Sequence, residues 1–193
     1  MEDRLIAQDA IGCALGFNPS PIDDGGKIEG WFTAVCRDKD GNELWREEFP
    51  NTVVTVGVNA MLDAALAGSA YTVTGPFMGL ISATPTTANA DTLASHAGWT
   101  EVGLANAPTY SVGRKTCVWS AASARAKALS AGLVFTFTGS GTVGGVFIVY
   151  GSGAVATIDN TSGTLFSAGA FTGGNQAVVS TNTITVSYTV TIT

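Results

Sequence analysis

The chain contains one histidine, His96, which lies between two carboxylates of the same segment, Asp91 and Glu101. A Ser-His-Asp triad would need its nucleophile on a sharp elbow such as GxSxG, and the sequence contains no such motif. A single histidine without nearby cysteines also falls short of the ligand set of most zinc sites. We therefore interpret His96 as a loop or interface residue that makes ordinary hydrogen bonds.

Three glycines, Gly139, Gly141 and Gly144, spell GxGxxG directly after a predicted strand. In dinucleotide-binding proteins this pattern opens a helix whose N-terminus holds the pyrophosphate. Here the apolar run from Val146 to Tyr150 follows, which is typical of a strand. We interpret the glycines as a hairpin turn and expect no nucleotide cofactor.

Asp38, Asp40 and Asn42 occupy the first three ligand positions of a calcium-binding loop. However, Glu43 stands where that loop requires glycine, and Phe49 stands where it requires a bidentate glutamate. The Asp-Gly pair inside the segment favours a tight turn between two strands. The sequence therefore predicts a hairpin at this point and no metal site.

The charged residues are few and unevenly distributed. There are 9 basic and 15 acidic residues, the net charge is -6, and no basic cluster is present, so nucleic-acid binding is not expected. Beyond residue 63 the acids are only Asp91, Glu101 and Asp159, which is sparse for the paired carboxylates of a glycosidase. We expect a protein without enzymatic activity and without a cofactor.

Cysteine use and the N-terminal residues indicate where the protein is made. Cys13, Cys36 and Cys117 are odd in number and match no metal-binding spacing, which favours buried thiols in a reducing cytoplasm. Acids replace the basic start of a signal peptide. No run of about 18 apolar residues is present, so we expect no membrane span.

The secondary-structure pattern is that of an all-β protein. The segment from Thr183 to Thr193 alternates apolar and hydroxyl residues without a break, which is the period of a half-buried strand. The segment from Leu133 to Gly151 combines an alternating stretch with a continuous apolar one, and we interpret it as a central hairpin. Such strands need sheets above and below them, which predicts a β-sandwich or barrel.

Other segments complete the prediction. Strands are expected at 31–37, 43–49, 76–85 and 110–119, with Leu44 and Trp45 as packing residues, and a loop is expected at 120–131. One amphipathic helix is expected from Val56 to Gly68, because Val58, Met61, Leu62, Ala65 and Leu66 share one helical face. The turn-forming residues before position 28 predict an extended N-terminal arm at 1–28, followed by a sandwich domain at 29–193.

About half of the chain, from Phe49 to Tyr150, resembles a group of small virion structural proteins of tailed bacteriophages. The resemblance is carried by FPNTVVTVGVNAMLDAAL, PFMGLI, the DTLASHAGWTEV loop with Tyr110 and Arg114, and FTFTGSGTVGGVFIVY. It implies a β-sandwich of jelly-roll type, made in the host cytoplasm and located in the virion. The implied function is that of a capsid-associated or tail-associated protein without catalytic activity. Our first interpretation within that group is a head decoration or cement protein which contacts the major capsid protein, because low charge and Gly/Thr-rich strands suit a small oligomeric clamp.

Two alternatives stay open. The protein could be a tail, neck or fibre component that contacts the host surface, or a carbohydrate-binding module that uses exposed aromatic residues such as Trp99. The loop at 86–103 is longer than most connections and is therefore functional or an interface. This makes His96, Trp99 and Glu101 interface candidates.

The last third of the chain also points to assembly. Residues 128–193 carry one charge, whereas about a quarter of the residues of an average protein are charged. An uncharged closing strand at a sheet edge would promote aggregation, so we expect it to be covered in a homo-oligomer, with Thr185 and Thr189 at the interface. A trimer is what the resemblance to phage decoration proteins implies.

Overall fold

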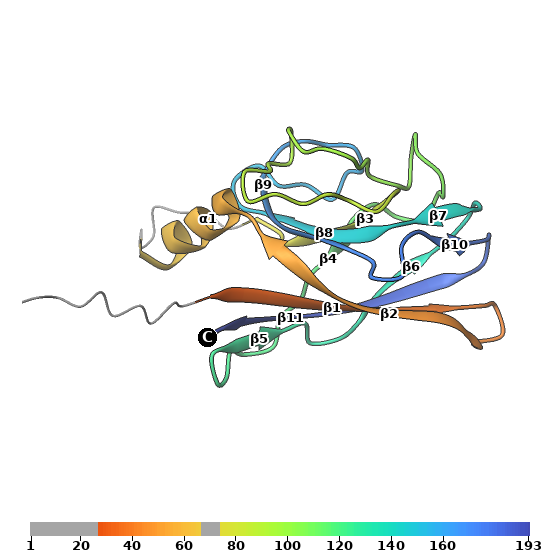
Figure 1. Cartoon of the computed structure of the whole chain (residues 1–193), viewed down its shortest axis with the longest axis horizontal. Coiled ribbons are helices and arrows are strands. Elements are labelled where there is room, and N and C mark those ends of the chain that lie inside the picture. The colour runs from red at the N-terminus through yellow and green to blue at the C-terminus, as the bar shows by residue number, and fades with distance from the viewer. Residues whose placement is uncertain (1–26, 67–73) are drawn as a thin grey trace, which may run out of the picture.

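The computed structural model describes residues 27–66 and 74–193 and shows an antiparallel sheet that curls into two layers, with one helix at one end (Figure 1). This confirms the predicted all-β class. The elements in chain order are β1 (Ile28–Arg37), β2 (Glu43–Val53), α1 (Thr55–Leu66), β3 (Phe77–Ile81), β4 (Lys115–Thr116), β5 (Ala126–Ala128), β6 (Leu133–Thr136), β7 (Gly141–Val143), β8 (Gly145–Tyr150), β9 (Thr164–Ala170), β10 (Gln176–Val178) and β11 (Thr183–Ile192).

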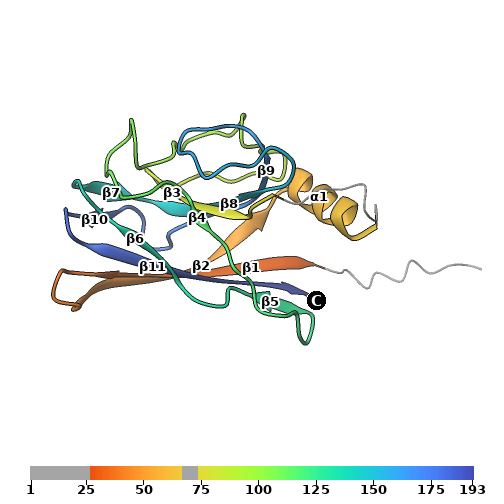
Figure 2. The same cartoon turned by 180° about the vertical axis from the view of Figure 1, so that it is seen from behind.

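The curl of the sheet depends on β2, which belongs to both layers. Most of β2 pairs with β1, but its last two residues, Thr52 and Val53, pair with β9. The strand order is β4-β3-β8-β9-β2-β1-β11-β5, with β6 also on β11. One layer therefore consists of β1, β11, β5 and β6, and the other of β3, β4, β8 and β9; both are visible from behind in Figure 2.

The main core lies between the two layers and is rich in aromatic residues. Phe32 of β1 stacks on Phe49 of β2 at a centroid distance of 5.3 Å and contacts Tyr188 of β11 at 4.4 Å. Ile184, Val186 and Tyr188 are all buried, as their period-2 spacing predicts. Strand β11 thus directs its apolar side chains into the core and its hydroxyl side chains outward.

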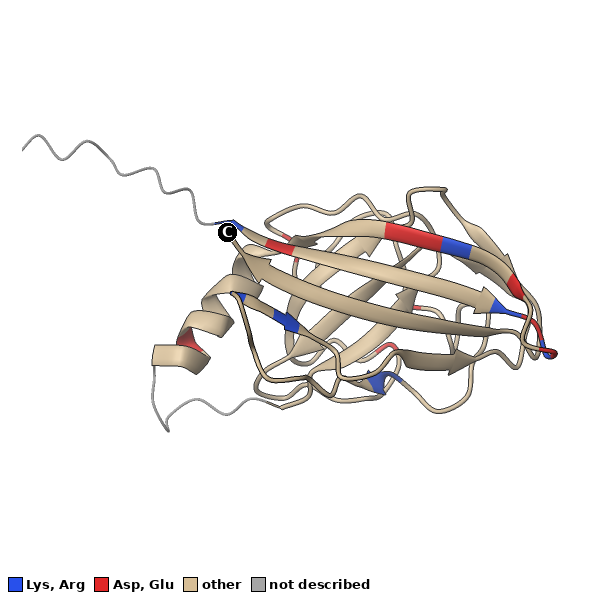
Figure 3. Ribbon diagram, turned by 90° about the horizontal axis from the view of Figure 1, so that it is seen from below, with Lys and Arg blue, Asp and Glu red and all other residues tan. Residues whose placement is uncertain are grey.

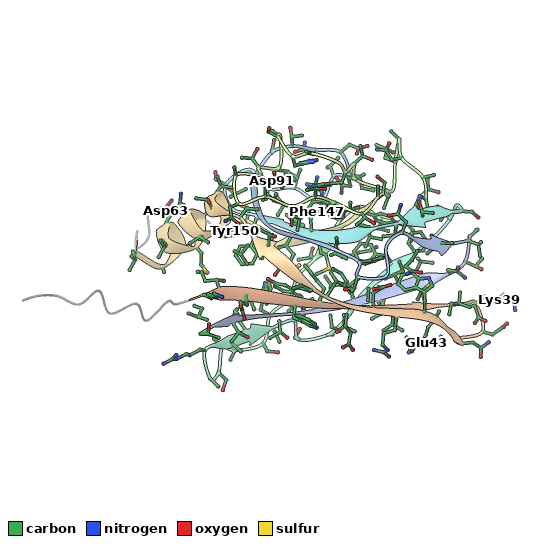
Figure 4. All side chains as sticks on the ribbon, viewed as in Figure 1. Lys39, Glu43, Asp63, Asp91, Phe147 and Tyr150 are labelled. Carbon is green, nitrogen blue, oxygen red and sulfur yellow. The ribbon has the colours of Figure 1, made fainter. Side chains whose placement is uncertain are left out.

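Strand β8 is buried on both faces, as the sequence predicted from its continuous apolar run. Val146 and Ile148 face the main core. Phe147 and Val149 face a second cluster, to which the long loop after β3 contributes Trp99. This second cluster fixes the loops to the outer side of the β3–β8–β9 layer, where Figure 4 shows Phe147 beneath them.

The predicted β1–β2 hairpin is confirmed, and its turn uses the Asp38 carboxylate internally. Asp38 Oδ1 accepts hydrogen bonds from the backbone N–H groups of Asp40 and Asn42, both at 2.9 Å. The side-chain hydrogen bond from Asn42 lowers the pKa of Asp38. Leu44, predicted to pack, is half exposed, whereas Trp45 contacts Phe171 at a centroid distance of 5.6 Å.

The predicted central hairpin between residues 133 and 151 is wrong. β6 pairs with β11, whereas β8 pairs with β3 and β9, so the glycine-rich segment carries the chain from one layer to the other. A strand does follow Gly144, as predicted, and a side chain at Gly144 would collide with the backbone of Ala83 and Thr84. The local pattern reported burial correctly, but it contains no information on which strand is the partner.

The helix is present, but its predicted buried face is wrong. The buried residues of α1 are Gly57 and Ala60, whereas Leu62 is 50% and Leu66 81% exposed. A Cβ atom at Gly57 would lie 2.5 Å from Phe166 O, so only glycine lets the helix lie this close to the β9 backbone. The Tyr150 hydroxyl donates to Gly57 O at 2.8 Å.

Two further predictions differ from the structure. In the segment 110–119 only β4 is a strand, because the chain turns at Val112, which has a φ of 59°, and directs Arg114 inward. The segment 120–131, predicted as a loop, contains β5, which pairs with β11. No helix in the two described ranges has the length and hydropathy needed to cross a bilayer.

The prediction that the closing strand lies at a sheet edge is wrong. β11 lies between β1 on one side and β5 and β6 on the other, so its backbone is paired along both edges. It therefore needs no protection against edge-to-edge association. Only its outward face, with Thr185 and Thr189, is available to a partner.

The predicted arm at 1–28 lies outside the described residues except for its last two. Lys27 N donates to Thr193 O at 3.2 Å, and Ile28 is the first residue of β1. The start of β1 and the C-terminus therefore lie together, at the end of the sandwich that also carries α1 (Figure 1).

Candidate functional site

A buried ion pair joins the two long loops on the outer side of the β3–β8–β9 layer. Arg114 Nε donates to Glu101 Oε1 at 2.9 Å, and Arg114 Nη2 donates to Glu101 Oε2 at 2.7 Å. The same guanidinium donates to the carbonyl oxygens of Val155 at 3.2 Å and Asn160 at 2.7 Å. Glu101 Oε2 also accepts the backbone N–H of Asp159 at 2.8 Å. The pair therefore holds the loop at 151–163 to the loop that contains Glu101.

The electrostatics of this pair are those of a structural anchor. Glu101 is 7% and Arg114 3% exposed. Burial raises the pKa of the Glu101 carboxyl, while the hydrogen bonds and charge of Arg114 oppose that rise. Three donors already bind the carboxylate oxygens, so the hydrogen bonds of this group serve the fold.

His96 and Trp99 form a stacked pair beside the anchor. Their ring centroids are 3.5 Å apart and the planes differ by 10°. Phe147 also contacts the indole, at a centroid distance of 5.3 Å, and Trp99 is only 6% exposed. Trp99 therefore cannot serve as the exposed stacking platform that the carbohydrate-binding interpretation assigned to it, because its side chain is buried.

The imidazole of His96 is set up to be neutral. Burial lowers its pKa, so the uncharged form dominates at pH 7. Asp91 Oδ2 accepts the backbone N–H of Ala88 at 2.9 Å, which places this carboxylate in a turn of its own loop. Both residues therefore help to pack this loop: Asp91 through its hydrogen bond to the backbone, and His96 through the stacking of its ring on Trp99.

The stacked rings and the ion pair line the same cavity, which has a volume of about 180 Å³. Its lining includes His96, Trp99, Glu101, Arg114, Asp159 and Asn160. The structure thus brings His96, Trp99 and Glu101 together, as their shared loop suggested. Asp159 and Asn160 come from a distant loop, and no sequence signal linked them to this place. Within the described part of the chain, no group of three or more His, Cys, Asp or Glu side chains could hold a metal ion.

Thr185 and Thr189 lie on the opposite layer, on the outward face of β11. Thr189 is paired with Trp31 of β1, which is 50% exposed, and Thr185 with Val134 of β6, which is 49% exposed. β11 carries no charged residue, and Figure 3 shows that the charges seen from this side gather on β2 and at the ends of the sandwich. We call the surface formed by Trp31, Val134, Thr185, Ser187 and Thr189 the neutral face.

Replacing His96 by Ala should leave the fold intact and cost about 1 kcal/mol, the value of one aromatic contact. Because the folded state disfavours the charged imidazole, the unfolded state binds more protons below pH 6.5. The contribution of His96 to stability is therefore lost as the pH falls through this region. Urea unfolding of both proteins at several pH values measures the difference, and a turnover that depends on His96 would contradict the structural role.

Comparisons of the chain with protein-family models, with curated proteins and with solved structures gave no match.

Proposed function

We propose that the protein is a non-enzymatic structural protein of a tailed-phage virion, and specifically a head decoration or cement protein that braces the capsid shell. Its sandwich is then of jelly-roll type, and it acts as a homotrimer that contacts the major capsid protein. The resemblance of the segment from Phe49 to Tyr150 motivates this proposal, and the structural observation that carries it is the neutral face.

The neutral face has the composition of a surface that is covered in an assembly. It combines a half-exposed tryptophan and valine with a row of hydroxyls, and β11 contributes no charge to it. Exposed Trp is enriched at the centres of protein interfaces, where charged residues are depleted. The surface lies on β11, whose backbone is paired with β1 on one side and β6 on the other, so it is held in place before it meets a partner.

The buried carboxylates of the sandwich support a structural role because their hydrogen bonds hold distant segments of the chain together. Glu101 holds Arg114, as described above, and the buried Glu47 accepts Gln176 Nε2 at 2.7 Å and the backbone N–H of Gly173 at 3.0 Å. Both carboxylates tie distant loops to a strand or to each other. A particle-bound brace needs this kind of rigidity.

In solution, light scattering at micromolar concentration should give a mass near three times 19.6 kDa. The Thr185→Lys/Thr189→Lys variant should be folded but monomeric, because two ammonium groups would enter the neutral face and like charges from each subunit would meet. It should also fail to bind virions that lack the protein.

The Ser152→Lys/Thr157→Lys variant is the matched control, since both of these exposed residues lie in the loop on the opposite layer. It adds the same charge and should stay assembled. A stable monomer of the unmodified protein that is insensitive to charge at Thr185 and Thr189 would overturn the assembly part of the proposal.

Two other functions are alternatives to the decoration role, and each would use residues of the neutral face. A tail, neck or fibre component would use the same neutral face, and its copy number per particle would be far lower. A carbohydrate-binding module would use Trp31, whose indole is half exposed beside Thr189. Glycan-array binding that is lost on Trp31→Ala, with the mass unchanged, would favour that module.

A further inference from the structure

An open apolar pocket of about 270 Å³ lies at the end of the sandwich that carries α1. Its walls come from the helix and from both layers, and its lining includes Met61, Ala64, Trp119, Ile148, Phe166 and Val190. Figure 4 places Tyr150, which also lines it, beneath the helix that carries Asp63. A pocket of this size and lining suits aliphatic or aromatic side chains.

The N-terminal part of the chain joins the body next to this pocket. Lys27 N donates to Thr193 O, and Gly30 of β1 is paired with the pocket residue Val190. The linker 18–26 can span up to about 30 Å. Gly30 is only three residues after Lys27, so this span is several times the distance along β1 from the linker to the position beside Val190. The segment before the linker can therefore reach the pocket of its own chain.

The segment 5–17, LIAQDAIGCALGF, has the matching chemistry. It carries five large apolar side chains, those of Leu5, Ile6, Ile11, Leu15 and Phe17. Residues 1–26 contain five acids and one arginine. Lys127 lines the pocket, Lys27 is hydrogen-bonded to Thr193, and Arg125 O accepts the backbone N–H of Ile192, so these three basic residues lie at the pocket end of the sandwich. Two acids, Glu29 of β1 and Asp63 of α1, lie at the same end, and Figure 3 shows charges of both signs near the start of β1 and the helix.

We propose that the segment 5–17 docks into the apolar pocket beneath α1 of its own chain, with Asp9 and the acids that flank the segment near the three basic residues. The short tether gives a local concentration of the order of millimolar, so a weak contact is enough to keep the pocket filled. This inference does not rest on the virion proposal, because it concerns how one subunit closes its own open end.

Cys13 lies inside the segment and reports on docking through its reaction with a maleimide. Burial raises the pKa of Cys36 to about 11 and that of Cys117 to about 12, so these two thiols react slowly. In the unmodified full-length protein Cys13 should react about tenfold more slowly than in the Ala64→Arg variant, whose side chain would fill the pocket. The Ala65→Arg variant, at an exposed position of the same helix, should keep the slow rate.

An Ile11→Asp variant tests the same contact from the side of the segment, should also release Cys13, and leaves the body unchanged. The slow rate should not depend on protein concentration. Equal fast labelling in all variants would overturn the proposal, and would be the result if residues 67–73 cover the pocket instead. Protection that appears only at high concentration would assign the pocket to a neighbour's segment, and protection that Ala64→Arg does not relieve would place the segment elsewhere; both would overturn it.

Discussion

Replacing Arg114 by Met should destabilise the protein by about 3–5 kcal/mol, because it leaves the Glu101 carboxylate buried without its cation. Arg114 makes four hydrogen bonds to Glu101 and to two carbonyl oxygens of the loop at 151–163. The variant therefore loses an ion pair and also leaves buried acceptors without donors. Urea unfolding followed by tryptophan fluorescence measures the change in the free energy of unfolding.

The pH dependence of this effect has a definite sign. Burial raises the pKa of Glu101 above its ordinary value of 4.5, and removal of Arg114 takes away the main opposing influence. Between that value and the raised one, the folded state binds more protons than the unfolded state, so stability falls as the pH rises. The Arg114→Met variant should thus be closest to the unmodified protein in acid and furthest from it at neutral pH.

Arg46 provides a matched control for Arg114. It also binds a glutamate through two hydrogen bonds, at 3.2 and 3.1 Å to Glu43, but its side chain is 46% exposed. Arg46→Met should therefore cost less than about 1 kcal/mol. A double variant, Glu101→Gln/Arg114→Met, should recover part of the lost stability. If Arg114→Met and Arg46→Met had equal small effects, the buried pair would not be the anchor of the loops.

Replacing Val186 by Lys should abolish the folded state. Val186 is fully buried and lies between Ala34 of β1 and Leu133 of β6, so an ammonium group there would enter the main core with no partner. A penalty of more than about 4 kcal/mol approaches the whole stability of a small domain. Circular dichroism and thermal unfolding should show no cooperative transition.

Ser187 is the matched control for Val186, because it is the next residue of β11 and points to the exposed side. Ser187→Lys should leave each subunit folded with a cooperative unfolding transition, although its ammonium group enters the neutral face and should weaken assembly. The sequence pattern placed Val190 on the same buried face, but Val190 is only partly buried beside the pocket under α1. A folded, cooperative Val186→Lys variant would mean that β11 has a different register.

The sequence predicted those features that depend on neighbouring residues along the chain. The faces of β11, the double burial of β8 and the turn at Asp38 all follow from spacing within about ten residues. The partner of β6 could not be predicted this way, since pairing depends on segments that are distant in sequence. The buried face of α1 was missed because Gly57 packs through its backbone against Phe166, a contact that leaves no apolar side chain to detect.

The candidate site was predictable in the same partial way. His96, Trp99 and Glu101 could be grouped because they share one loop, and Thr185 and Thr189 because they alternate in one strand. The pairing of Glu101 with Arg114 could not be predicted, because the segment around Arg114 was interpreted as a strand, whereas its backbone turns at Val112. The prediction that Trp99 is exposed was wrong for a related reason. His96 and Phe147 contact the indole, and only the fold brings Phe147 next to Trp99.

The most direct test of the proposed function is the copy number of the protein in purified phage particles, since the proposal makes it a component of such a particle. Quantitative mass spectrometry against the major capsid protein gives this ratio. A decoration protein that braces the shell should be present in hundreds of copies per particle, in a fixed proportion to the capsid protein, and particles without it should break at lower temperature or osmotic stress. A few dozen copies or fewer, with capsid stability unchanged in their absence, would contradict the decoration role.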